Sequence, residues 1–173
     1  SSVTAMGIRS DNRVYLSYVT LQNSTIVGGQ VGLYLANSVA TPSVTATNFT
    51  ISGNTFQSQV QKAIYVERLS QSTITHCVFT GVSTDTAYDF NTIVDFNLKY
   101  GTFSNLTLSD STFSGGPVAM TGTTDVRRAV AVAVKARGGG TDTSYNVSGS
   151  PGATLTTVAL SNLSFSSIPN TAI

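Results

Sequence analysis

Side chains capable of acid–base chemistry are scarce in this sequence, and its carboxylates are the first candidates. The 173 residues include eight Asp and Glu, one His and one Cys. Glycoside hydrolysis uses two carboxylates roughly 5 to 10 Å apart, and the candidate pair is Glu67, the only glutamate, with Asp95. Asp89 would be a third acid, with Arg68 or Lys99 as a nearby cation. The alternative interpretation is that these groups are solvated charges beside a strand.

The single histidine and the single cysteine belong to no Ser-His-Asp, Cys-His or phosphate-loop pattern. His76 stands at a predicted bend, so we expect a turn residue rather than a general base. Cys77 has no partner for an intrachain disulfide, and a zinc site built on cysteines is excluded. We expect Cys77 to be buried as a small hydrophobic residue.

Two tyrosines stand at equivalent places in similar segments. Tyr34 follows Leu33, and Tyr65 follows Ile64. If both point outward from successive turns of a repeat, they offer apolar area and hydroxyl groups to a carbohydrate or a protein. The alternative, which we favour, is packing of one ring against the other across neighbouring strands.

A six-residue pattern recurs along most of the chain and indicates how these side chains are positioned. Its first position is Leu or Ile, its sixth is Ile or Phe, and its fifth is Thr, Val or Ser, which is typical of strands on both sides of a break. The third position holds residues that tolerate a left-handed backbone, as expected for a one-residue bend. The five copies are residues 21–26, 51–56, 74–79, 108–113 and 160–165. The bend residues are Asn23, Gly53, His76, Asp110 and Asn162.

A second turn and a third strand follow the repeat in several copies, as in 32–35 and 63–66. Three strands per coil predict an all-β solenoid in which coils stack about 4.8 Å apart and like residues lie on like. We expect one domain over 1–173, with about five to six coils, cut from a longer solenoid. Residues at about 121–153 are an inserted loop or a degenerate coil, because Asp110 and Asn162 are 52 residues apart. Glu67 and Asp95 are expected to follow corresponding strands of adjacent coils.

The pattern resembles that of the pectate-lyase-like superfamily, whose coils bend between two strands at a single left-handed residue, often Asn. The resemblance covers nearly the whole chain and implies a right-handed, single-stranded parallel β-helix. Members include polysaccharide lyases and hydrolases, epimerases, adhesins and phage tailspikes, so the fold does not choose a function. The adjacent Asp-Asp and Asp-Pro-His signatures of the fold's hydrolases and epimerases are absent.

Bulk composition limits the partners. A formal net charge of +1 gives no reason to expect nucleic acid, and no apolar run approaches the roughly 20 residues of a membrane span. The sequence begins at Ser1 without Met, which is compatible with a removed signal peptide or a start inside a longer protein. Five Asn-x-Ser/Thr sequons are weak evidence for glycosylation in a composition this rich in Asn, Ser and Thr. They begin at Asn23, Asn48, Asn105, Asn146 and Asn162.

From the sequence we predict a non-catalytic solenoid that is extracellular, on a cell surface or on a virion. It would act in adhesion, in recognition of a receptor or carbohydrate, or as a rigid spacer. An oligomer is compatible with this prediction. The alternative is a polysaccharide lyase or hydrolase, or a phage tailspike depolymerase, with its site on the sheet bearing Glu67 and Asp95. We expect no cofactor, and calcium only if the chain is a lyase.

Overall fold

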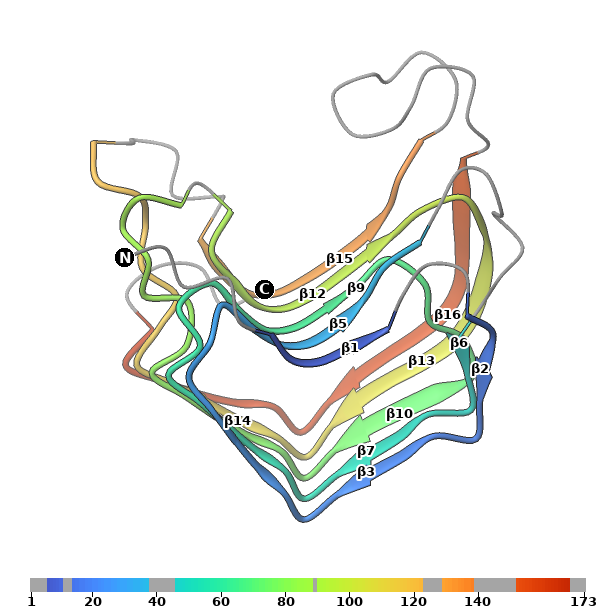
Figure 1. Ribbon diagram of the computed structural model, residues 1–173, viewed down its shortest axis with the longest axis horizontal. Coiled ribbons are helices and arrows are strands. Elements are labelled where there is room, and N and C mark those ends of the chain that lie inside the picture. Colours follow the sequence, from blue (N-terminus) through green and yellow to red (C-terminus); the bar gives the residue numbers. More distant parts are fainter. Residues whose placement is uncertain are drawn as a thin grey trace.

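The computed structural model describes residues 6–10, 14–37, 46–88, 90–122, 129–138 and 152–168. Within these ranges every regular element is a β-strand, and there is no helix. The chain visits three parallel sheets in turn, so strands that are neighbours in a sheet come from successive passes of the chain. Figure 1 shows this stacking: in each sheet the strands follow one another from blue to red in the same direction. The structure is therefore a parallel β-solenoid.

Three five-stranded sheets make up most of the solenoid. A fourth, two-stranded sheet pairs β2 (Leu16–Ser17) with β6 (Ala46–Thr47). Sheet I contains β1 (Met6–Ser10), β5 (Val31–Leu35), β9 (Lys62–Val66), β12 (Thr92–Leu98) and β15 (Val130–Ala136). Sheet II contains β3 (Thr20–Gln22), β7 (Thr50–Ser52), β10 (Ser72–Thr75), β13 (Gly101–Ser109) and β16 (Ala153–Ser161). Sheet III contains β4 (Thr25–Val27), β8 (Thr55–Gln57), β11 (Val78–Thr80), β14 (Thr112–Ser114) and β17 (Ser164–Ser166).

Single left-handed residues make the corners. The five bend residues of the repeat lie between sheets II and III and have φ between 49° and 65°. A second column follows sheet III, at the turn that the sequence also indicated: Gly28, Ser58, Gly81, Gly115 and Ser167. A third column begins or interrupts the strands of sheet II: Tyr18, Asn48, Gln71, Asn105 and Thr157. This third column was not predicted, because its residue types share no preference for positive φ.

The sixth positions of the repeat form an internal ladder, which confirms that prediction. Ile26 pairs with Phe56, and the register continues through Phe79 and Phe113 to Phe165. The rings stack nearly parallel, with centroids 5.3, 4.7 and 5.0 Å apart along the ladder. Gly7 and Gly32, the second residues of β1 and β5, make room for this ladder. A Cβ on Gly32 would lie 2.8 Å from the Phe56 ring and 2.6 Å from the Ala63 carbonyl oxygen.

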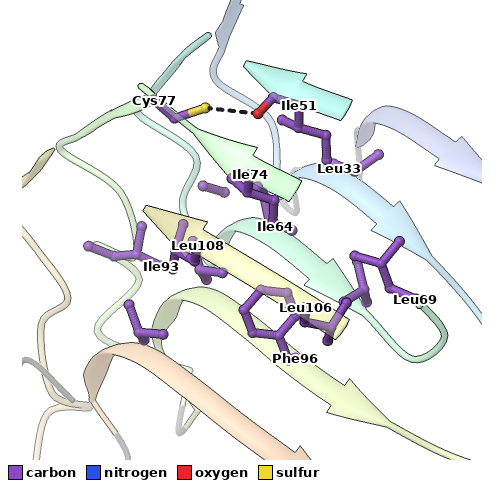
Figure 2. Packing of buried hydrophobic residues seen from close by; sticks show 14 of the residues in the cluster. Leu33, Ile51, Ile64, Leu69, Ile74, Cys77, Ile93, Phe96, Leu106 and Leu108 are labelled. Atoms are coloured by element: carbon purple, nitrogen blue, oxygen red, sulfur yellow. Dashed lines mark hydrogen bonds between the residues drawn. The ribbon is translucent and has the colours of Figure 1, made fainter. Parts of the chain in front are cut away.

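Aliphatic side chains from sheets I and II fill the rest of the core. Figure 2 shows Ile51, Ile74 and Leu108 of sheet II directed into the space that Leu33 and Ile64 of sheet I also occupy. Cys77 is 1% exposed, as expected, and its thiol is directed toward the carbonyl oxygens of Thr75 and Ile51. Thus the fourth position of the repeat also faces inward. At this position a small polar side chain can hydrogen-bond to the backbone of the next coil: the Ser111 hydroxyl accepts a hydrogen bond from the Cys77 N–H.

The strands on either side of the long interval between Asp110 and Asn162 are neighbours in their sheet. Strand β13 pairs directly with β16, and the Asn162 side chain donates a hydrogen bond to the Asp110 carboxylate at 2.9 Å. The intervening β15 pairs with β12 in sheet I. The stacking of sheets II and III therefore continues across this interval.

Candidate recognition site on the outer face of sheet I

Charged residues within the described strands are confined to one sheet. The strands of sheets II and III contain no Asp, Glu, Lys or Arg. The strands of sheet I contain Arg9, Lys62, Asp95 and Lys135. Three further charged residues directly follow its strands: Glu67, Lys99 and Arg137. This distribution makes sheet I the charged sheet of the described solenoid, and its outer face is therefore the candidate site.

Asp95 is buried in the middle of β12 and is held between two lysines. Its side chain is 3% exposed and lies 3.0 Å from the Lys62 ammonium and 2.6 Å from that of Lys135. Lys62 also donates to the Phe90 carbonyl oxygen at 2.6 Å. Burial alone raises the pKa of Asp95, but the two ammonium groups outweigh it and hold that pKa below its ordinary value. Asp95 is therefore ionised near neutral pH.

The sequence placed Asp95 wrongly. We expected Asp95 to follow its strand, as Glu67 follows β9. Asp95 lies within β12 instead, where it pairs with Tyr65 of the neighbouring strand. The outward-facing column runs Arg9, Tyr34, Tyr65, Asp95 and Ala133. The register could not be predicted because β12 is longer than β9 and carries buried side chains along its whole length, without a simple alternation.

Glu67 is equally constrained. Its Oε1 atom lies 2.6 Å from the Lys99 ammonium and accepts a hydrogen bond from the Tyr65 hydroxyl at 2.9 Å. Its Oε2 atom accepts the Asn37 backbone N–H at 2.8 Å. With Glu67 7% exposed and Asp95 2% exposed, neither carboxylate is a solvated surface charge, so that interpretation is wrong for both.

Tyr34 and Tyr65 stack on one another, with ring centroids 5.3 Å apart and planes 16° apart. The guanidinium of Arg9 lies over the Tyr34 ring at 5.9 Å. The Tyr65 hydroxyl also accepts a hydrogen bond from the Asn97 side chain at 2.7 Å. Burial raises the pKa of Tyr65 above its ordinary value, and the nearby Glu67 carboxylate raises it further. This arrangement favours cross-strand packing, because the rings use their faces on each other and leave little for a sugar.

A cleft of about 240 Å³ opens on this face between β9, β12 and β15 and the segment that precedes β12. Phe90 is 39% exposed, and its ring meets that of Tyr88 edge-on at 6.4 Å, so one wall is aromatic. The Arg137 Nε–H donates to the Asn97 side-chain oxygen at the other end. The lining residues are Lys62, Tyr65, Tyr88, Phe90, Asp95, Asn97, Lys99, Lys135 and Arg137. The cleft combines several cations with an aromatic wall and a few fixed hydrogen-bonding groups.

Sequence reasoning therefore found part of this site. It named Tyr65, Asp95 and Lys99, and it missed Lys62, Asn97, Tyr88, Phe90, Lys135 and Arg137. One signal was available: the chain has three lysines, and all of them line this cleft. Arg68 does not reach the cleft. It is fully buried and donates hydrogen bonds to the Val14 carbonyl oxygen and the Ser10 hydroxyl. Asp89 lies outside the described residues.

The other residues that could do chemistry lie elsewhere. His76 is exposed at its corner, with φ of 53°, and its Nδ1 atom is 2.8 Å from the Thr75 hydroxyl. Within the described ranges, no group of three or more His, Cys, Asp and Glu side chains could hold a metal ion. The described part of the chain likewise has no helix long and apolar enough to cross a membrane.

No family model, no curated protein and no solved structure matches the chain.

Proposed function

We propose that this chain is an extracellular, cell-surface or virion module that recognises a carbohydrate, free or on a receptor, with the outer face of sheet I. The observation that carries the proposal is the cleft between β9 and β15. It places aromatic surface from Phe90 and Tyr88 beside hydrogen-bonding groups that are fixed by their neighbours. Carbohydrate sites need both, since sugars present apolar C–H faces and many hydroxyl groups.

The same groups argue against catalysis. A glycosidase needs one carboxyl group that is protonated near neutral pH to serve as the general acid. The pKa of Asp95 is held low instead, and Glu67 is occupied by a lysine, a tyrosine hydroxyl and a backbone N–H. Because both carboxylates are occupied by protein groups, they serve better to position cations than to transfer protons.

The finer description of the fold belongs to the proposal. We propose a right-handed parallel β-helix similar to the pectate-lyase-like superfamily. Support comes from the column of left-handed residues between sheets II and III and from the ladder of stacked rings inside it. The uncharged Ser- and Thr-rich outer strands of sheets II and III fit a stiff support whose specificity lies on sheet I.

Binding and turnover should be measured on the same preparation. The protein is screened against an array of neutral and acidic glycans, and each ligand found is then incubated with the protein, with and without calcium. Reducing ends report hydrolysis, and the absorbance of unsaturated sugars reports elimination. We expect saturable binding without turnover, weakened by Phe90→Ala and unaffected by Val27→Ala, which removes an exposed apolar side chain from sheet III.

Two results would contradict the proposal. Absence of binding to every glycan would leave the chain a spacer. Turnover that disappears in Glu67→Gln or Asp95→Asn would establish the alternative, a polysaccharide lyase or hydrolase. Tyr65→Ala is expected to weaken binding only through its hydrogen bonds to Glu67 and Asn97, because its ring stacks on Tyr34.

A further inference from the structure

Lys62 and Asp95 form an ion pair between neighbouring strands that is shielded from solvent. The two side chains are 4% and 3% exposed, and the Lys62 Nζ atom lies 3.0 Å from Oδ2 of Asp95. Lys62 begins β9, and Asp95 lies in the middle of β12. The Nζ atom also lies 5.6 Å from the centre of the Tyr65 ring and 5.5 Å from that of the Tyr88 ring. An amine and a carboxyl group are therefore held together beside two aromatic rings.

Burial destabilises both charges of this pair. Charged groups lose more solvation on leaving water than a neutral amine and a neutral carboxylic acid do. Burial lowers the pKa of Lys62, and the Asp95 carboxylate opposes that effect. The ion pair is the resting form, because the two lysines beside Asp95 hold its pKa low. The neutral form, with the proton on Asp95 Oδ2, is a minor population reached by one proton transfer along the 3.0 Å contact.

Lys135 holds the other oxygen of the same carboxyl group. Its ammonium lies 2.6 Å from Oδ1 of Asp95. A cation at this oxygen stabilises the negative charge that develops there when a nucleophile adds to the carboxyl carbon. The Phe90 carbonyl oxygen accepts a hydrogen bond from the Lys62 ammonium at 2.6 Å and limits the movement of that group. The site therefore holds a nucleophile, an electrophile and an oxyanion-stabilising cation in contact.

We propose that the Lys62 and Asp95 side chains join in an amide bond, an isopeptide crosslink between β9 and β12. An ammonium proton of Lys62 moves to Oδ2 of Asp95, and the lone pair of the neutral Nζ atom then adds to Cγ. Lys135 stabilises the charge on Oδ1 during this addition. The Cγ–Oδ2 bond breaks, and Oδ2 leaves as water with a second proton from Nζ. An ammonium and a carboxylate thus become an amide and water, so the reaction needs no other reagent.

Two features of the site favour the reaction. Holding the reacting groups in contact replaces a bimolecular encounter by an intramolecular step, which is worth effective concentrations of roughly 10⁵ M or more when the orientation is good. The amide also removes two charges from a buried position. Because the bond forms once in each molecule, a small population of the neutral form of Lys62 and Asp95 is sufficient. Molecules in which the bond has not formed keep the ion pair and its titration.

A second lysine–carboxylate pair in the same cleft provides an internal control. Lys99 lies 2.6 Å from Oε1 of Glu67, which is as close an approach, but these side chains are more exposed, at 19% and 9%. The other Glu67 oxygen accepts the backbone N–H of Asn37 instead of contacting a second cation. We therefore expect the Lys99–Glu67 pair to remain an ion pair.

Mass spectrometry of the denatured, purified chain tests the proposal. We expect the intact mass to lie below that of the sequence by one water molecule. Trypsin should fail to cleave after Lys62, and residues 14–68 should remain linked to residues 69–99. Fragmentation of the linked peptides should place the bond between Lys62 and Asp95 and leave Glu67 unmodified.

Variants identify the reacting groups, and circular dichroism checks that each one folds. Lys62→Arg keeps a cation beside Asp95 but removes the amine, so it should have the full mass of its sequence. Asp95→Asn should lose ammonia instead of water and arrive at the same product, with the same mass as the crosslinked parent chain. Lys135→Gln should slow bond formation after refolding by about 100-fold, the effect of removing one oxyanion-stabilising group.

Three results would overturn the inference. The first is a parent chain with the full mass of its sequence. The second is a loss of water that persists in Lys62→Arg, because the dehydration would then lie elsewhere. The third is a linked peptide that joins Lys99 to Glu67 while Lys62 remains free. Bond formation at an unchanged rate in Lys135→Gln would overturn the role assigned to Lys135.

Discussion

The ladder of stacked rings gives the sharpest stability prediction, and Phe79 is the residue to perturb. Its side chain is fully buried and stacks on Phe56 at 5.3 Å and on Phe113 at 4.7 Å. Phe79→Ala removes a buried aromatic group and leaves a cavity, which costs about 3–5 kcal/mol. Two ring contacts worth about 0.5–1.5 kcal/mol each are part of that loss.

The matched control is Phe165→Ala, at the end of the same ladder. Phe165 is partly exposed and stacks only on Phe113 in the described part of the chain, at 5.0 Å. Truncation there opens toward solvent, so we expect a cost of about 1–2 kcal/mol from partial burial and one ring contact. Urea unfolding of both variants, followed by circular dichroism, measures the free energies. Equal losses, or a loss below about 1 kcal/mol for Phe79→Ala, would refute the ladder as a main source of stability.

Three further predictions concern a corner, a close contact and an ion pair. His76→Asn should leave the melting temperature unchanged or raise it, whereas His76→Val should lower it, because a β-branched residue is strained at φ of 53°. Gly32→Ala should cost about 1–3 kcal/mol in urea unfolding, because its Cβ would lie 2.6 Å from the Ala63 carbonyl oxygen. Asp95 has a pKa in the folded protein that lies below its unfolded value of about 3.9, so its stabilising contribution is present above that pH. This contribution is lost as pH falls through the folded pKa. The free energy of unfolding, measured from about pH 5 to pH 2, should therefore fall less steeply in Asp95→Asn.

The sequence predicted the repeat well because its physical signals are local. The pattern of one hydrophobic residue on each side of a one-residue bend can be recognised within six residues. Asn23, Gly53 and Asp110 are also residue types that adopt the left-handed backbone conformation more readily than others. The inward ladder then follows from stacking equivalent positions. The corner at Tyr18, Gln71 and Thr157 escaped prediction because the stacked strands impose positive φ on residues without that preference.

The candidate site could be predicted only in part, because it depends on register. Tyr34 and Tyr65 were matched correctly since the segments around them are alike. Asp95 was not, since the longer β12 gives no local sign of which residue meets Tyr65. Lys135 lies 40 residues beyond Asp95 in the chain, and Lys135 and Arg137 join the site only through the pairing of β12 with β15.

The sequence by itself determined the class of structure, the positions of the bends and the identity of the internal ladder. These depend on backbone preference and on burial of Leu, Ile and Phe, which are properties of short segments. Only the tertiary structure decided that β13 and β16 are neighbours across the long interval before Asn162 and that all three lysines converge on one cleft. Parallel pairing joins residues that are far apart in the chain, and the net charge of +1 conceals how those charges are distributed in space.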